Sequence, residues 1–102
     1  MEALIANKNI EVNEQGYLLN MADWDQEVAK TLAIEEEIEL TERHFEVLNY
    51  LRFEQEKGTA LSIRRVGKSG VVDIKEFYQL FPEGPLKKAS RIAGIPKPAS
   101  CI

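Results

Sequence analysis

The sequence predicts an α+β fold that is mainly helical: a small N-terminal β-hairpin on a compact bundle of about five helices, followed by a flexible C-terminal arm. Three observations favour this fold. Short alternating segments stand at the N-terminus, apolar residues at helical spacing with capping residues fill the middle, and a tail with two prolines closes the chain. The 102 residues are one domain's length. We place the domain at 1–94 and the arm, which bears the thiol, at 95–102.

The hairpin is predicted at residues 3–6 and 9–12, where Ile10 and Val12 alternate with polar residues after a polar turn. A second turn at 13–16 leads into a further apolar stretch. We expect this small meander or hairpin to cover a helical core.

The first two helices are predicted from their caps. Asp23 followed by Gln26 is a capping-box pattern and predicts a helix over about 24–34, with Trp24 on its apolar stripe. Thr41 is predicted to cap the central core helix over 42–57. Phe53 falls on the polar side of that helix, so we expect another part of the fold to cover it.

Three shorter helices are predicted after Gly58. The first covers 59–66, and the second covers 74–81 with Asp73 and Glu76 as a capping box. Pro85 suits the first position of the third, which Gly94 ends. On this last helix we expect three basic residues to point outward, Lys87, Lys88 and Arg91.

Composition restricts the location of the protein and its chemistry. One cysteine excludes an intrachain disulfide and indicates a reducing compartment. We find no apolar run long enough to span a membrane and no signal peptide, so we expect a cytoplasmic protein. His44 is the only histidine and no ligand cluster accompanies it, so we expect a partly buried helix residue, no metal and no cofactor.

Charge is distributed unevenly along the chain. Residues 1–56 hold 14 acidic and 4 basic side chains, whereas residues 57–102 hold 3 acidic and 9 basic ones. Such asymmetry is typical of a protein that binds nucleic acid or an acidic partner surface, and also of an ordinary solvated face. The short helices around Gly67 resemble a helix-turn-helix, and nucleic-acid contact would fall to its basic residues, Arg64, Arg65 and Lys68.

Cys101 is the strongest candidate for a reactive residue, because this only cysteine lies next to the C-terminus. An exposed thiol is an oxidation liability, so its position indicates a use; a residue that is merely near a frayed end is the alternative. Pro96 and Pro98 favour an extended backbone. From Gly94 the tail would reach roughly 25 Å, enough to enter a pocket of another protein.

Four motifs carry a resemblance to a known family: GYL at 16–18, LTxxHFxV at 40–47, LFPxGP at 80–85 and IAGIPKPxxCI at 92–102. Together they resemble the DsrC/TusE family over most of the chain. The resemblance implies a small helical protein with an N-terminal hairpin and a mobile arm, whose penultimate cysteine carries sulfur or docks into a partner.

Within the family, TusE-type members accept persulfide sulfur from the TusBCD complex and pass it toward 2-thiouridine formation in tRNA. DsrC-type members bind the siroheme sulfite reductase and carry a second arm cysteine, at the position that is Ser90 here. This difference favours a TusE-like carrier, a sulfurtransferase-type role, or a single-cysteine paralogue in sulfur-oxidation trafficking or regulation. The short segment between Gly58 and Asp73 departs from the family's helix-turn-helix region, which leaves partner identity open.

We therefore expect a sulfur carrier with Cys101 as acceptor and donor, since a thiolate takes a sulfane sulfur and a second thiolate removes it. The implied partners are a TusBCD-like donor and a tRNA thiolase or a sulfite-reductase-like acceptor. A nucleic-acid-binding regulator and a non-catalytic subunit whose tail plugs into an enzyme are the alternatives. The residues expected to bind the partner are Lys87, Lys88, Arg91, Pro96, Lys97, Pro98 and Ile102.

Overall fold

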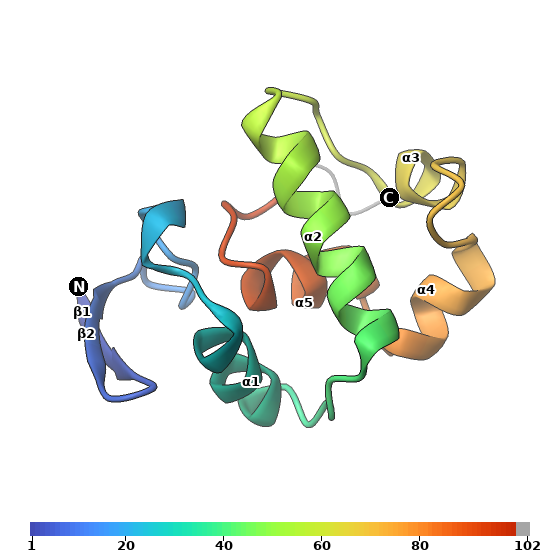
Figure 1. Cartoon of the computed structure of the whole chain (residues 1–102). Coiled ribbons are helices and arrows are strands. Elements are labelled where there is room, and N and C mark those ends of the chain that lie inside the picture. The colour runs from blue at the N-terminus through green and yellow to red at the C-terminus, as the bar shows by residue number, and fades with distance from the viewer. Residues whose placement is uncertain (100–102) are drawn as a thin grey trace.

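The computed structural model describes residues 1–99; Ser100, Cys101 and Ile102 lie outside the described residues. Its two strands form an N-terminal hairpin at one end of a group of helices, as predicted (Figure 1). In chain order the elements are β1 (Glu2–Ile5), β2 (Lys8–Glu11), the 3₁₀ turn η1 (Met21–Asp23), α1 (Gln26–Glu35), α2 (Glu42–Glu56), α3 (Ile63–Gly67), α4 (Ile74–Leu80) and α5 (Pro85–Ile92).

The hairpin turns at Ala6-Asn7, one residue earlier than the sequence predicts. Both residues have positive φ, 52° and 64°, as the two-residue turn that matches the twist of an antiparallel pair requires. Ile5 therefore pairs with Lys8. Because the turn is two residues long and shifted, β1 and β2 also begin one residue earlier than expected.

The cap of α1 was wrongly assigned. Asp25, and not Asp23, is the N-cap, and its carboxylate accepts a hydrogen bond from Val28 N at 2.8 Å. Asp23 ends the preceding 3₁₀ turn, and Trp24 adopts an extended conformation between the two elements. Trp24 thus lies outside the helix whose apolar stripe we expected it to join.

The central helix α2 begins at a reciprocal cap. The Thr41 hydroxyl accepts from His44 N at 3.4 Å, and Nδ1 of His44 accepts from Thr41 N at 3.1 Å. On the other side of the ring, Nε2 donates to Leu80 O at 2.9 Å, which joins α2 to the end of α4. Phe53 is 60% exposed, so the expectation that the fold covers it was wrong; the Lys57 ammonium lies 5.0 Å from its ring centroid.

The helix predicted over 59–66 is shorter, because its N-cap is Ser62, which accepts from Arg65 N at 3.0 Å. Asp73 caps α4 as expected. The side chain of Glu76 does not complete a capping box, since it accepts hydrogen bonds from Arg43 on α2 at 2.7 and 2.8 Å. This pair fixes the start of α4 against α2, and the hydrogen bonds lower the pKa of Glu76.

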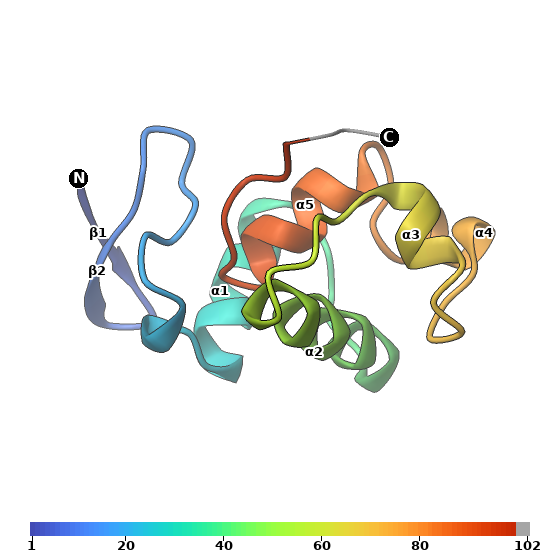
Figure 2. The same ribbon diagram turned by 90° about the horizontal axis from the view of Figure 1, so that it is seen from above.

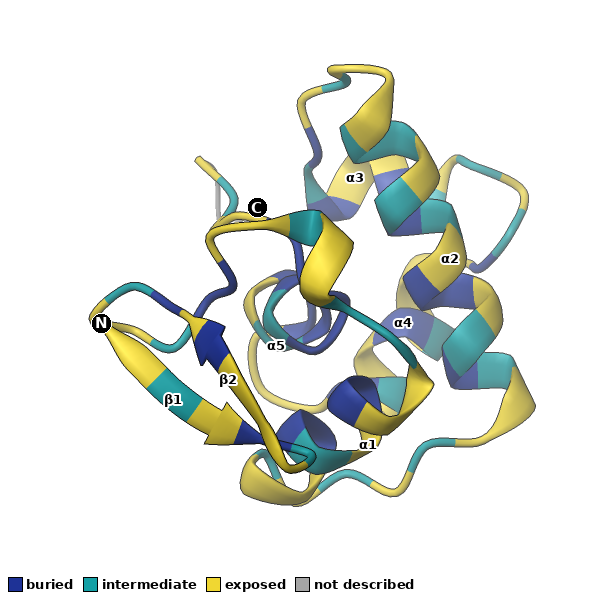
Figure 3. Ribbon diagram, turned by 60° about the vertical axis from the view of Figure 1, so that its left-hand side comes forward, coloured by how far each residue is buried: buried dark blue, intermediate teal, exposed yellow. Residues whose placement is uncertain are grey.

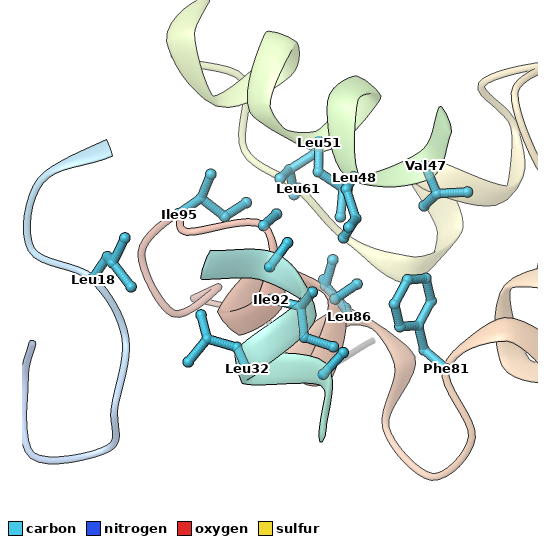
Figure 4. Packing of buried hydrophobic residues seen from close by; sticks show 14 of the residues in the cluster. Leu18, Leu32, Val47, Leu48, Leu51, Leu61, Phe81, Leu86, Ile92 and Ile95 are labelled. Carbon is cyan, nitrogen blue, oxygen red and sulfur yellow. The ribbon is translucent and has the colours of Figure 1, made fainter. Parts of the chain in front are cut away.

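The core is organised around α5, which contacts α1, α2 and α4. In Figure 3 the buried faces of α1 and α2 turn toward α5, which is seen nearly end-on. Figure 4 shows Leu86 and Ile92 of α5 between Leu32 of α1 and Leu48 of α2. Burying each such side chain contributes about 1.5–3 kcal/mol. Among residues 1–99 no helix has the length and hydrophobicity needed to cross a membrane.

Candidate functional site

The candidate site is the root of the arm and the surface of α5 beside it. Cys101 and Ile102 are outside the described residues, so their predicted roles rest on the sequence. The described part of the arm, 96–99, follows the three residues that come after α5. Figure 2 shows this segment turning back after α5 and running alongside it. The described part of the arm therefore lies beside α5.

Ile95 corrects the predicted start of the arm. Its side chain is 0% exposed and belongs to the core cluster, between α2 and Leu18 in Figure 4. Its amide donates to Ser90 O at 3.2 Å, which folds the chain back onto the helix end. Ile95 therefore packs as part of the domain, because the turn after Gly94 points it inward. The mobility of 96–102 stays a prediction.

Arg91 was expected to point outward, and this was wrong. Its guanidinium lies under the end of α1, where Nη1 binds Glu36 at 3.0 Å and Nη2 binds Glu35 at 2.5 Å. Nε donates to Gly16 O at 3.3 Å. Burial lowers the pKa of Arg91, but the two carboxylates more than offset this, so the net shift is upward. Arg91 is therefore a structural link between α5, the end of α1 and the turn at Gly16.

The four basic residues that we expected to guide docking lie around one cavity. The cavity holds about 320 Å³ and is lined by Gln15, Tyr17, Glu36, Glu83, Lys87, Lys88, Arg91 and Lys97. Lys88 is 4.0 Å from Glu83, whereas no ion pair within residues 1–99 involves Lys87 or Lys97. The four basic side chains outnumber the two acidic ones, Glu36 and Glu83, so the cavity rim, as we term this lining, has a net positive charge suited to an acidic side chain.

Gln15, Tyr17 and Glu36 were not among the predicted site residues. Tyr17 is buried and its hydroxyl donates to Lys87 O at 3.1 Å, so the N-terminal region forms one wall of the cavity. The GYL motif at 16–18 was the only sequence signal near Tyr17. It did not reveal that Tyr17 contacts Lys87, 70 residues later in the chain.

Ser90 faces a second cavity, under the arm. This cavity of about 330 Å³ is lined by Gln55, Gly58, Thr59, Ala60, Leu61, Ser90, Pro96, Lys97, Pro98 and Ala99. The Ser90 side chain is 0% exposed, and its hydroxyl has no hydrogen-bond partner among the described residues. The arm root, with Pro96 and Pro98, therefore lies on the protein beside a buried hydroxyl.

The second basic group lies on α3. Arg64, Arg65 and Lys68 line a cavity of about 470 Å³ with Tyr50 and three further residues, Glu54, Ser62 and Ser69. Burial, followed by the charge of Glu54, raises the pKa of Tyr50. The structure thus gathers both predicted basic groups into cavities, but around different elements.

Comparisons with known proteins agree with the resemblance. A family model described as "DsrC like protein" matches residues 4–102. The chain belongs to the DsrC-like family. Relatives include "Sulfurtransferase TusE" of Photorhabdus laumondii, 44% identical over 103 residues and 93% of each chain. The "Sulfurtransferase TusE homolog" of Haemophilus influenzae is 39% identical over 91% of this chain and 93% of its own.

Solved DsrC structures share the whole fold. The NMR structure of Allochromatium vinosum DsrC matches with a TM-score of 0.82 at 37% identity, covering all of both chains. The crystal structure of the oxidised γ-subunit of the dissimilatory sulfite reductase (DsrC) from Archaeoglobus fulgidus matches with a TM-score of 0.80 at 37% identity, again over both chains. These matches confirm the family and the fold class expected from the sequence.

His44 has a structural part in this DsrC-like fold. It is 7% exposed; its Nδ1 accepts from Thr41 N in the cap of α2, and its Nε2 donates to Leu80 O, which joins α2 to α4. Residues 1–99 contain no group of three or more His, Asp or Glu side chains arranged to hold a metal ion.

Proposed function

We propose that this chain is a carrier in a sulfur relay, in which Cys101 accepts a sulfane sulfur from a donor persulfide and passes it to an acceptor thiol. One observation carries the proposal: a relative named "Sulfurtransferase TusE" is 44% identical over 93% of the chain. The single cysteine of the chain agrees with it. A lone thiol forms no internal disulfide, so a persulfide is the sulfur-bearing state open to it.

The transfer balances with two thiolate attacks. The Cys101 thiolate attacks the outer sulfur of the donor persulfide, a new S–S bond forms at Cys101, and the donor thiolate leaves with the electron pair of the broken bond. An acceptor thiolate then attacks the outer sulfur on Cys101, which restores the Cys101 thiolate. The carrier undergoes no net oxidation.

The donor or acceptor protein would dock on the basic rim of the cavity beside α5. Lys87, Lys88, Arg91 and Lys97 surround one cavity, and Lys97 belongs to the arm itself. A donor or acceptor with an acidic face would meet this rim while Pro96, Pro98 and Ile102 enter its pocket with the thiol. Charge complementarity of this kind mainly raises the association rate.

The TusE-like direction, toward tRNA 2-thiouridine formation, is the version of the relay that we favour. Ser90 stands where two-cysteine family members carry their second thiol, and it is a buried hydroxyl. The donor would then be TusBCD-like and the acceptor a tRNA thiolase, rather than a sulfite reductase.

Mass spectrometry tests the carrier. After incubation with a persulfidated donor, the C-terminal peptide should gain about 32 Da per sulfur, and Cys101→Ser should gain nothing. Labile sulfur on Cys101→Ser would refute the proposal. A tight complex with the partner that survives Cys101→Ser, with no sulfur on the wild-type chain, would support a non-catalytic subunit instead.

A nucleic-acid ligand is the second candidate, on the strength of the cavity that joins Arg64, Arg65 and Lys68 to Tyr50. Phosphate contacts by such side chains weaken steeply with salt. Binding of tRNA or duplex DNA should then fall with salt concentration and should lose slope in Arg64→Ala. Binding that is undetectable at low salt would remove this candidate.

A further inference from the structure

The last four carbonyl groups of a helix have no partner within the helix, and in α5 all four are bound. Backbone amides take two of them. Gly94 N donates to Arg91 O at 3.1 Å, and Ile95 N donates to Ser90 O at 3.2 Å. This is the Schellman arrangement, which needs a left-handed residue after the helix; Gly94 supplies it with φ 69°. These two backbone bonds and Gly94 form the turn that ends the helix.

Two side chains take the other two carbonyls. Trp24 Nε1 donates to Ile92 O at 2.7 Å, and Arg52 Nη1 donates to Ala93 O at 2.8 Å. Arg52 Nη2 also donates to Met21 O at 3.0 Å, and the guanidinium carbon is 4.3 Å from the centroid of the Trp24 ring. These contacts of Trp24 and Arg52 at the end of α5 form what we term the arm clamp. It ties η1, α2 and α5 together where the arm begins.

Trp24 also contacts the first residue of the turn. A Cβ atom at Gly94 would lie 2.6 Å from Trp24 Cδ1, so the indole is packed directly against the Gly94 backbone. After this point the chain runs back alongside α5, as Figure 2 shows, and Lys97 reaches both cavities beside the helix. The chain therefore changes direction at Gly94 and Ile95, directly after the two carbonyl groups that the clamp binds.

Closing the helix does not by itself require Arg52, because the Schellman bonds and Gly94 already end α5. Taking a guanidinium partly out of water costs free energy, and burial lowers the pKa of Arg52 while the charge of Glu56 offsets only part of this. The cost is incurred where the guanidinium joins Ala93 O, the last carbonyl before Gly94, to Met21 O of η1. A more sharply defined direction of the arm would offset the cost of burying the Arg52 guanidinium at this position.

We propose that Trp24 and Arg52 are positioning residues, which fix the direction in which the arm leaves α5 and so present the thiol to its partner from one side. The effect on sulfur transfer rests on the proposed carrier function, whereas the effect on the arm root does not. A thiol that already points to its target has fewer arrangements to search, and misplacement by about 1 Å can cost up to about a hundredfold in rate.

Amide hydrogen exchange tests the clamp without any sulfur chemistry. In Arg52→Ala and in Trp24→Phe, which keeps an aromatic ring but loses the N–H donor, protection of the Gly94 and Ile95 amides should fall about tenfold or more, while Leu48 in α2 keeps its protection. Val66→Ala, a cavity variant in α3, is the control for general loss of stability. Unchanged protection at Gly94 and Ile95 in both clamp variants would overturn the inference.

Transfer kinetics test the functional part. At saturating persulfide donor, Arg52→Ala should transfer sulfur about ten times more slowly or worse, with the Kd for the donor within about twofold of wild type, and Arg52→Lys should fall between. Equal rates for Arg52→Ala and Val66→Ala would contradict a positioning role. A wild-type chain that accepts no sulfur would instead contradict the proposed function, and the exchange data alone would then judge the clamp.

Discussion

The segment from α5 through Ile95 and the segment that follows it share one sequence motif but differ in their packing. Ile92, Ala93 and Ile95 are each 0% exposed, whereas Pro96 and Lys97 are exposed. The change occurs between two neighbouring residues. The residues of the motif up to Ile95 thus pack in the core, and the exposed residues begin at Pro96.

The difference has a physical origin in the turn at Gly94. A left-handed residue reverses the chain and brings the next side chain, Ile95, back onto the core. Pro96 and Pro98 then lack amide donors and cannot continue a ladder or a helix. The predictions below test whether the boundary between the two segments lies where the burial places it.

We expect the largest change in the free energy of unfolding from truncating the chain on either side of this boundary. A chain ending at Gly94 should have a free energy of unfolding about 3 kcal/mol lower than one ending at Ile95, since a fully buried isoleucine is lost. Urea denaturation measures both. A chain ending at Ile95 should match the full-length protein closely, and equal stability of the two truncated chains would place Ile95 in the arm after all.

Gly94→Ala should lower the free energy of unfolding by about 2 kcal/mol, because a left-handed alanine costs about 1 kcal/mol and its Cβ would also meet Trp24. Gly58→Ala is the matched control: Gly58 has φ 80°, and a Cβ there meets nothing within 4 Å. Thermal unfolding of the pair isolates the contact with Trp24. An equal loss in both variants would show that this contact has no energetic weight.

Reversing the charge of two cavity-rim residues, Lys87 on α5 and Lys97 in the exposed segment, should change the association rate and leave the free energy of unfolding unchanged. The double variant Lys87→Glu, Lys97→Glu should slow association with the persulfide donor about tenfold at low salt, and the difference should shrink as salt rises. Lys75→Glu, on the exposed face of α4, serves as the control. Stopped-flow association across a salt series is the measurement, and rates that are indifferent to the reversal would make the rim ordinary solvated surface.

The smallest effect is expected at Ser90. Its buried hydroxyl has no partner among the described residues, so Ser90→Ala removes an uncompensated polar group. The free energy of unfolding should stay the same or rise by up to about 1 kcal/mol. A loss above about 1 kcal/mol, measured in urea, would mean that the hydroxyl has a partner in solution.

Much of the architecture could be predicted from the sequence because the decisive signals are local. Thr41, Asp73 and Pro85 each stand at the start of the helix they predict. The cap of α1 was wrongly assigned because Asp23 and Asp25 are equally suitable residues two positions apart. Which of them caps depends on the 3₁₀ turn that precedes the helix.

The site was harder to predict because its contacts are distant in sequence. The motif indicated the thiol, and the pattern of the last helix indicated the basic residues, but the sequence did not reveal that Lys87, Lys88, Arg91 and Lys97 line one cavity. Arg91 could not be recognised as an ion-pair residue, since Glu35 and Glu36 precede it by more than 50 positions. Arg52 carried no signal at all, because its partners are backbone carbonyls of Met21 and Ala93.

Trp24 is the only tryptophan in the sequence, and it lies beneath the point where the arm departs. Its indole is bound to a carbonyl of α5 and stacked under a guanidinium, two neighbours that strongly influence indole emission. The protein therefore contains an intrinsic fluorophore in contact with the Gly94 turn that precedes the arm. The fluorescence emission of Trp24 should therefore change, without any added label, when a bound partner moves the arm.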